Sequence, residues 1–143
     1  MTDYDIKKIY RICDANLNRA KEGLRVIEEY IRFYIEDAVL LKDIRDVRHK
    51  LSKISNEIYP KILTERNVIF DHGSKIAEEK RDDLKSVITA NFKRIQEALR
   101  VLEEFSKLPE FTNTDDKHQI FKNLRFKVYD LEKQLFLKNA KNL

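Results

Sequence analysis

The chain carries one segment of sequence twice. Residues 15–30 align with residues 90–105 at an offset of 75 positions, and nine of the sixteen aligned pairs are identical. Further along, Val47-Arg48-His49-Lys50 aligns with Leu124-Arg125-Phe126-Lys127 at an offset of 77. Internal repetition on this scale is typical of a duplicated supersecondary unit. We therefore expect two copies of one unit joined by a loop, with the copies at about residues 3–59 and 75–138 and the loop at about residues 60–74.

Both copies have the hydrophobic periodicity of amphipathic helices. Apolar residues recur at spacings of three and four along most of the chain, as at Leu17, Ala20 and Leu24. Only the short run Val68-Ile69-Phe70 has a strand-like composition. The predicted fold is all-α, a four-helix bundle from a tandem duplication of a helical hairpin, in a single domain covering residues 1–143. The four expected helices span about residues 3–34, 38–59, 75–108 and 115–138.

Capping residues and prolines set the expected helix ends. Side-chain oxygens that can accept a hydrogen bond from the first helical turn stand at Asp37, at Ser74 and at either Thr114 or Asp115. Pro60 and Pro109 are expected to end the second and third helices, because proline has no N–H and disfavours a helix interior.

The composition excludes several kinds of active site. The two glycines, Gly23 and Gly73, fit neither a Walker A loop nor a dinucleotide fingerprint. The single cysteine, Cys13, excludes a disulfide within the chain and argues against a thiolate zinc site, so we expect it to be a buried apolar residue. The three histidines lack metal-motif spacing, and no serine lies in a nucleophile elbow. Any nucleotide has to be bound by side chains and helix ends.

The charge is mixed, with 29 Lys and Arg against 25 Asp and Glu, for a net charge of +4. This excess allows an anionic small molecule as ligand, whereas the interleaving of acids and bases argues against nucleic acid. No run approaches the roughly 18 apolar residues of a membrane span, and no signal segment opens the chain. We expect a cytoplasmic protein. The wide apolar arcs of the helices are compatible with a homodimer.

Two polar residues are repeated inside the apolar arc. On a helical wheel Asn16 lies near the middle of the arc and Arg19 inside its edge, and Asn91 and Arg94 occupy the same places in the second copy. We expect both arginines to be half-buried, a placement that is costly without a partner. The two arginines indicate either a binding site or a structural polar network.

Other charged residues are repeated at the margin of the arc. Glu22 and Glu97 lie within one turn of the arginines and could orient them or bind a metal. Each copy also has a pair of adjacent glutamates, of which one could supply a magnesium ligand and at least one is expected to be solvated: Glu28-Glu29 and Glu103-Glu104. Two further arginines lie toward solvent, where surface ion pairs are an ordinary alternative to a site role: Arg25 and Arg100.

The loop between the copies contains Arg66, Asp71 and Gly73. A glycine there indicates either a turn with positive φ or the close approach of a ligand. Asp71 could bind Mg²⁺ or simply cap the turn or the following helix. Arg81 follows in a segment whose charges are also typical of a solvated helix start.

Together these motifs resemble one known family. They are Asp14-Ala15-Asn16-x-Asn18-Arg19-Ala20-x-Glu22-Gly23-Leu24-Arg25-Val26-x-Glu28, Val47-Arg48-His49-Lys50-Leu51, Asp71-x-Gly73 and Ala90-Asn91-x-x-Arg94-x-x-Glu97-Ala98-Leu99-Arg100-Val101-Leu102-Glu103-Glu104. Over nearly its whole length the chain is similar to the monofunctional hydroxymethylpyrimidine-phosphate kinases of thiamine biosynthesis, a domain found alone or fused ahead of thiamine-phosphate synthase. It resembles the stand-alone form. The family's loop reads Arg-Asp-x-x-x-Asp-x-Gly, and Asn67 stands here in place of the first Asp.

The resemblance implies ATP-dependent phosphorylation of 4-amino-5-hydroxymethyl-2-methylpyrimidine phosphate to the diphosphate, without action on the free alcohol. It implies ATP and Mg²⁺ as cofactors and a functional link to thiamine-phosphate synthase. Phosphoryl transfer depends mainly on positioning and charge neutralisation, so we expect the repeated arginines to gather two polyanions. The alternative is a non-catalytic helical module that binds the ligand or docks onto thiamine-phosphate synthase.

The expected site has three groups of residues. Those expected to act in catalysis are Arg19, Arg94, Glu22 and Glu97. Those expected to bind substrate or phosphate are Asn16, Asn91, Arg48, Arg125, Arg25, Arg100, Arg66, Arg81 and Gly73. Those expected to bind the metal are Asp71, Glu29 and Glu104.

Overall fold

A computed structural model describes residues 3–112 and 116–139 of the chain. It contains four long helices, and the described residues include no strand. The all-α prediction is therefore confirmed. No helix among the described residues is long and apolar enough to cross a membrane. The helices are α1 (Ile6–Glu29), α2 (Ala38–Leu63), α3 (Leu84–Phe105) and α4 (Lys117–Asn139).

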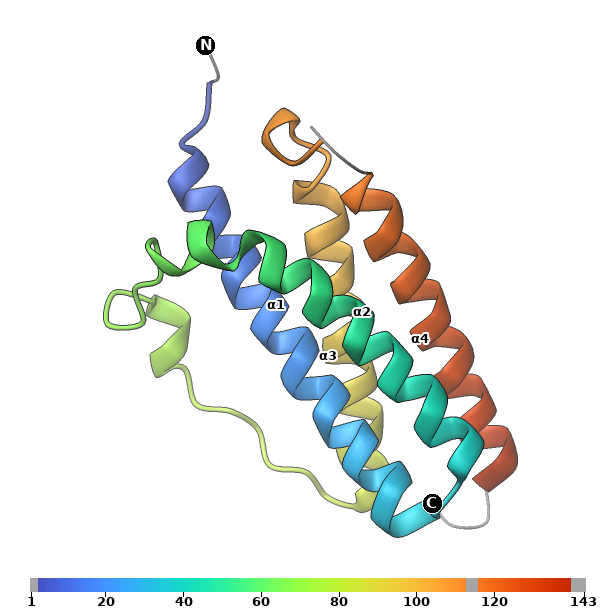
Figure 1. Cartoon of the computed structure of the whole chain (residues 1–143). Coiled ribbons are helices and arrows are strands. Elements are labelled where there is room, and N and C mark those ends of the chain that lie inside the picture. The colour runs from blue at the N-terminus through green and yellow to red at the C-terminus, as the bar shows by residue number, and fades with distance from the viewer. Residues whose placement is uncertain (1–2, 113–115, 140–143) are drawn as a thin grey trace.

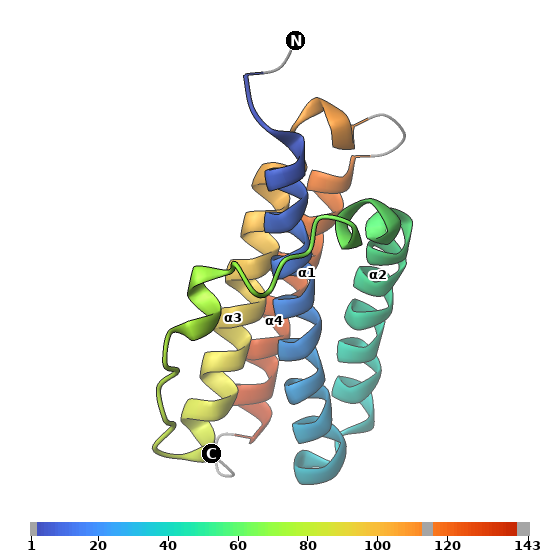
Figure 2. The same cartoon turned by 90° about the vertical axis from the view of Figure 1, so that its left-hand side faces the viewer.

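The antiparallel pair α1 and α3 forms the centre of the bundle. α2 packs on α1 and α4 packs on α3, as Figures 1 and 2 show. Apolar residues from all four helices fill the interior, among them Leu24, Leu51, Phe92 and Val128. Cys13 belongs to this core, where burial raises the pKa of its thiol to about 12. It is a packing residue, as expected.

Gly23 sets the close approach of α1 and α3. A Cβ atom added there would lie 2.7 Å from Cγ1 of Ile95 and 3.3 Å from the backbone oxygen of Asn91. The residue at the matching position of the second copy is Ala98, which is also buried. Small residues at these two positions let the central helices pack with little space between their backbones.

The first helix ends earlier than its periodicity predicts. The α-helix stops at Glu29 and continues as a π-helical segment, Tyr30–Ile35, which ends when Glu36 adopts φ 58°. The wider turn stacks the rings of Tyr30 and Tyr34, whose centroids are 5.3 Å apart. Asp37 caps α2 as expected, accepting a hydrogen bond from the Leu40 N–H at 2.9 Å.

The prediction that Pro60 ends the second helix is wrong. α2 runs through Pro60 to Leu63. Pro60 lies in the last turn of α2 and is exposed. Because proline has no N–H, the helix lacks one backbone hydrogen bond there, close to its end. Burial of Ile62, which is 1% exposed, holds this final turn against the bundle.

The third helix begins nine residues later than predicted. Ser74 lies in a short 3₁₀ segment, His72–Lys75, and α3 begins at Leu84, where the Asp83 side chain accepts a hydrogen bond from the Ser86 N–H at 2.7 Å. Residues 76–83 are all exposed and mostly charged, so a helix there has no apolar face to bury. The helix also ends at Phe105 rather than Leu108, and Pro109 opens a 3₁₀ turn.

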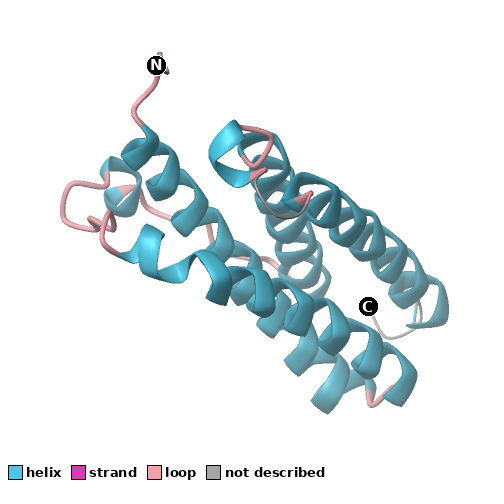
Figure 3. Cartoon of the chain, turned by 45° about the horizontal axis from the view of Figure 1, so that its top comes forward, coloured by secondary structure: helices cyan, strands magenta, loops and turns pink. Residues whose placement is uncertain are grey.

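The remaining local predictions have mixed outcomes. Val68-Ile69-Phe70 is not a strand but part of the exposed connection between α2 and α3. This connection is the longest loop in Figure 3. The predicted caps Thr114 and Asp115 lie outside the described residues.

Equivalent positions of the two copies make equivalent contacts between their paired helices. In the first copy Lys21 Nζ donates to Ser55 Oγ at 2.9 Å, and in the second copy Gln96 Nε2 donates to Glu132 Oε1 at the same distance. These pairs follow the offsets of 75 and 77 read from the sequence. The repeated sequence therefore corresponds to repeated hairpin packing.

Candidate functional site

The loop after α2 passes along α1 and α3 (Figure 2). Two adjoining cavities lie between this loop and the two helices. The α1–α3 cavity, of about 770 Å³, lies between the two central helices and loop residues 71–78. The α1–loop cavity, of about 620 Å³, lies between the N-terminal half of α1 and loop residues 66–71. They share Ala15, Asn16, Asn18, Arg19 and Asp71. The loop and α1 therefore form one continuous groove.

The α1–α3 cavity brings together seven residues expected from the sequence. They come from three separate segments and are Asn16, Arg19, Glu22, Asp71, Gly73, Arg94 and Glu97. All four residues expected to act in catalysis are among them. Arg19 lies on α1 in the first copy and Arg94 on α3 in the second, and these two helices pack closely at Gly23 and Ile95.

The expectation that these two arginines are half-buried is wrong. Arg19 and Arg94 are both exposed. Arginine is long, so a Cα atom at the edge of the apolar arc still allows the guanidinium to reach solvent. Arg19 donates to Asn16 Oδ1 at 3.4 Å, which is a long and weak contact. The guanidinium groups are therefore available to a ligand rather than committed to a structural network.

The repeated asparagines are buried as their position predicts. Asn16 is 5% exposed and its amide donates to the Ile12 carbonyl at 2.8 Å. Asn91 is half-buried and makes the same contact with Val87, also at 2.8 Å. Only Asn16 lines either of the two cavities, where it lies beside loop residues.

An ion pair fastens the start of the loop to α1. Arg66 donates from Nε to Asp14 Oδ2 at 2.7 Å and from Nη2 to Asp14 Oδ1 at 2.6 Å. The Asp14 side chain is only 8% exposed, and its hydrogen bonds raise the pKa of Arg66 above the ordinary value. Arg66, expected as a phosphate ligand, is thus already paired and forms a wall of the α1–loop cavity.

The rest of the loop is held by local turns. Asp71 accepts a hydrogen bond from the Gly73 N–H at 3.0 Å and caps the 3₁₀ segment. Gly73 does not have positive φ, so that alternative is wrong, whereas its position in the cavity wall agrees with the approach of a ligand. Asn67, which stands in place of the first Asp of the loop pattern, accepts a hydrogen bond from the Phe70 N–H at 3.2 Å. It therefore has a local structural role.

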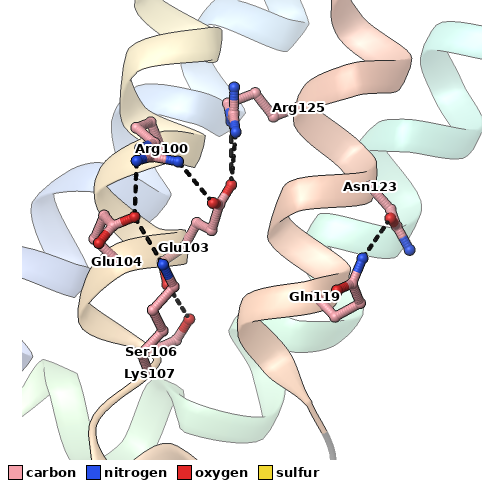
Figure 4. A network of polar contacts seen from close by, with 8 residues as sticks. All are labelled: Arg100, Glu103, Glu104, Ser106, Lys107, Gln119, Asn123 and Arg125. Carbon is pink, nitrogen blue, oxygen red and sulfur yellow. Dashed lines mark hydrogen bonds and ion pairs between the residues drawn. The ribbon is translucent and has the colours of Figure 1, made fainter.

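A second pair of expected phosphate ligands is used inside the bundle. Arg48 donates to both oxygens of Glu28 at 3.0 and 3.1 Å, and Arg125 donates twice to Oε1 of Glu103 at 3.2 and 3.0 Å (Figure 4). The glutamate side chains are 3% and 5% exposed. These duplicated ion pairs fasten α2 to α1 and α4 to α3.

The outer arginines join the same buried carboxylates. Arg25 contacts Glu28 at 2.7 Å and Arg100 contacts Glu103 at 2.9 Å, both at the i, i+3 spacing of helix-surface pairs. Arg100 also pairs with Glu104 at 3.0 Å. Arg45 adds a third guanidinium to Glu28 at 3.1 Å. Burial pushes the pKa of Glu28 upward, but the hydrogen bonds from Arg48 and Arg25 outweigh it and hold the pKa below its usual value.

The sequence reasoning named Glu28 and Glu103 only as members of carboxylate pairs that could supply a magnesium ligand, and it missed their role as buried partners of the arginines. Their neighbours Glu29 and Glu104 were expected to bind the metal, but both are exposed, and Glu104 pairs with Arg100 and Lys107. A signal was present, because Glu28 lies four residues after Leu24 and one after Ile27, in phase with the buried face.

The described residues do not form a preformed metal site. No group of three or more Asp, Glu, His or Cys side chains in this part of the chain is arranged to hold a metal ion. Asp71 lies in the groove, whereas Glu29 and Glu104 line neither cavity. Arg81 also lies elsewhere, exposed and donating to the Glu79 carbonyl at 3.1 Å.

Comparison with known proteins gives a consistent match. A model of the ThiD2 family matches residues 11–134. The chain is 42% identical over 130 residues to thiamine-phosphate synthase of Nostoc punctiforme, covering 89% of this chain and 35% of the relative. It is 44% identical over 134 residues to thiamine-phosphate synthase of Thermosynechococcus vestitus, covering 92% of this chain and 36% of the relative.

The chain thus spans about a third of the length of these curated relatives. No solved structure matches it significantly. The family match includes most of α1, the whole loop and both copies of the repeated motif. The chain therefore belongs to the ThiD2 family, a family linked to thiamine biosynthesis.

Proposed function

We propose that the chain is a kinase that transfers the γ-phosphoryl group of ATP to 4-amino-5-hydroxymethyl-2-methylpyrimidine phosphate. The observation that carries the proposal is the convergence of Arg19 and Arg94, one from each copy, on a single cavity beside Asn16. Both guanidinium groups are exposed to that cavity and free of ion pairs among the described residues. Membership of a family linked to thiamine biosynthesis supports the substrate class.

The reaction needs no general base. A phosphate monoester has its second pKa near 6, so the acceptor oxygen is already ionised at neutral pH. That oxygen forms a bond to the γ-phosphorus as the bond to the β-phosphate oxygen breaks, and ADP leaves with the electron pair. No proton is transferred. The protein's task is to hold two mutually repelling anions in line, which is the work that arginines on opposite walls of a cavity perform.

The same chemistry explains selection against the free alcohol. An alcohol has to lose a proton during the transfer, whereas the phosphate dianion has none to lose. The alcohol also leaves the phosphate-binding cations of the site unpaired. Because the described residues form no preformed metal site, magnesium is expected to enter as the MgATP substrate.

A coupled assay of ADP release tests the proposal. Purified protein is given MgATP together with the pyrimidine phosphate, with the free alcohol in a parallel reaction. We expect ADP with the phosphate and none above background with the alcohol. Equal rates with both would contradict the selectivity argument. Binding of the phosphate without ADP release would instead favour the alternative of a non-catalytic binding or docking module.

A further inference from the structure

The α1–loop cavity contains two cations that neither the sequence motifs nor the proposed function uses. Lys8 and Arg11 line it together with Arg19. Their spacing of three and then eight residues places all three on one side of α1, facing the loop. Lys8 and Arg11 are exposed and form no ion pair within the part of the chain that the structure describes.

The two cavities differ in charge. Four cationic side chains and two carboxylates line the α1–loop cavity. One cation and one carboxylate among them, Arg66 and Asp14, neutralise each other as an ion pair. The α1–α3 cavity has the opposite balance, with two arginines against four carboxylates: Glu22, Asp71, Glu78 and Glu97. The groove therefore has a basic end and an acidic end, and Arg19 lies at the junction because it lines both cavities.

This difference in charge makes each cavity suit a different one of the two anionic substrates. The acceptor carries a phosphate dianion without a counterion, so it needs protein cations and is repelled by a carboxylate-rich wall. The nucleotide triphosphate brings magnesium, which neutralises part of its charge before it binds. The α1–loop cavity also has apolar groups, Ile12 and Val68, beside the amides of Asn18 and Asn67. Apolar contact plus amide donors and acceptors suits a flat aminopyrimidine ring.

We propose that the α1–loop cavity is the acceptor site, in which Lys8 and Arg11 bind the phosphate of the aminopyrimidine phosphomonoester. The phosphate then lies near Arg19, at the junction of the cavities, where the transferred group has to meet it. The inference rests on the proposed function, because it names which end of the groove takes which substrate.

The test measures acceptor binding apart from turnover. The variants are Lys8→Ala and Arg11→Ala, and the matched control is Lys7→Ala, which removes the same charge from a neighbouring exposed residue that lines neither cavity. Calorimetric titration of the full chain with the pyrimidine phosphate, without nucleotide, gives the Kd. We expect each cavity variant to weaken binding about tenfold, as the loss of one charge-assisted contact does, with less than a twofold change in the control.

Steady-state kinetics add a second readout. The KM for the acceptor should rise about tenfold in both cavity variants, while the KM for MgATP changes less than twofold. A rise in the KM for MgATP with an unchanged acceptor KM would overturn the assignment, because the nucleotide would then occupy the basic end. Failure of the unmodified chain to bind the phosphomonoester would also overturn it. Binding that depends on Lys8 and Arg11 without ADP release would sustain this inference and refute the kinase proposal.

Discussion

Replacing Glu103 by alanine removes the carboxylate that compensates Arg125 between α3 and α4. Arg125 is only 12% exposed, and its guanidinium donates twice to Glu103 (Figure 4). Burial works to lower the pKa of Arg125, and its hydrogen bonds with Glu103 and Tyr129 outweigh that effect, so the pKa is raised overall. In the variant the arginine stays charged and loses its principal partner.

The expected loss of stability is about 3 kcal/mol. Removing one member of a buried ion pair typically costs roughly 3–5 kcal/mol, because the other charge is left uncompensated. The lower end applies here, since the rings of Phe126 and Tyr129 lie 4.9 and 5.8 Å from the guanidinium and retain some stabilising contact. For a domain of this size, that loss lowers the Tm by about 10 °C.

Urea unfolding followed by circular dichroism measures the effect, and the adjacent glutamate supplies the control. Glu104 is 43% exposed and pairs with Arg100 and Lys107 on the helix surface, so Glu104→Ala should change stability far less than Glu103→Ala does. The double variant Glu103→Met with Arg125→Met should recover most of the loss, because it removes both charges and keeps the volume. A Glu103→Ala variant no less stable than Glu104→Ala would refute the reasoning.

Three further predictions follow from the contacts already described. Gly23→Ala should destabilise the fold by about 1–2 kcal/mol, because the new Cβ meets Ile95 Cγ1 at 2.7 Å and the gain in helix propensity offsets only part of the overpacking. Glu28→Gln should flatten the loss of stability on acidification: the lowered pKa of Glu28 means that its contribution is present above its unfolded pKa and is lost as pH falls through the folded pKa. Arg19→Ala and Arg94→Ala should each lower the rate of ADP release at least ~100-fold with unchanged helix content.

Each of these has a matched control. Gly73→Ala should be nearly neutral, since its Cβ would lie 3.4 Å from Oδ1 of Asp71, at ordinary contact distance. Glu29→Gln, at an exposed neighbour, should leave the pH profile unchanged. Arg32→Ala removes an exposed arginine that lines neither cavity and should keep full activity. A threefold loss or less at both Arg19 and Arg94 would remove them from the site.

The number and order of helices follow directly from periodicity, but their ends do not. Ser74 and Asp83 are both acceptable caps, and nothing local distinguishes them. The structure selects Asp83 because residues 76–83 have no apolar face to pack, whereas Val87 and Ile88 begin one. At Pro60 packing extends a helix rather than delaying its start. The burial of Ile62 carries α2 through a residue that usually ends a helix.

For the site, the helical wheel predicts positions better than side-chain environments. It places Arg19 and Arg94 at the edge of the apolar arc, and both line the α1–α3 cavity, but it cannot say where a guanidinium ends, four bonds or more from the backbone. It also cannot show that Glu28 and Glu103 capture the arginines of the neighbouring helices. That requires knowing which helices are adjacent, and the spacing of residues within one helix does not contain this information.

The duplication and the loop make different contributions to the candidate site. Each copy supplies the same arginine, and the antiparallel crossing of α1 and α3 brings Arg19 and Arg94 to one cavity. The copies alone would generate two equivalent faces related by that crossing. The loop occurs once, because it connects the copies, and the Arg66–Asp14 pair fastens it to α1. Loop residues line both cavities with Asn16, whereas Asn91 lines neither, so the groove with a basic and an acidic end is built on the Asn16 side. A symmetric pair of hairpins thereby gains the asymmetry that the proposed transfer between two different phosphates requires.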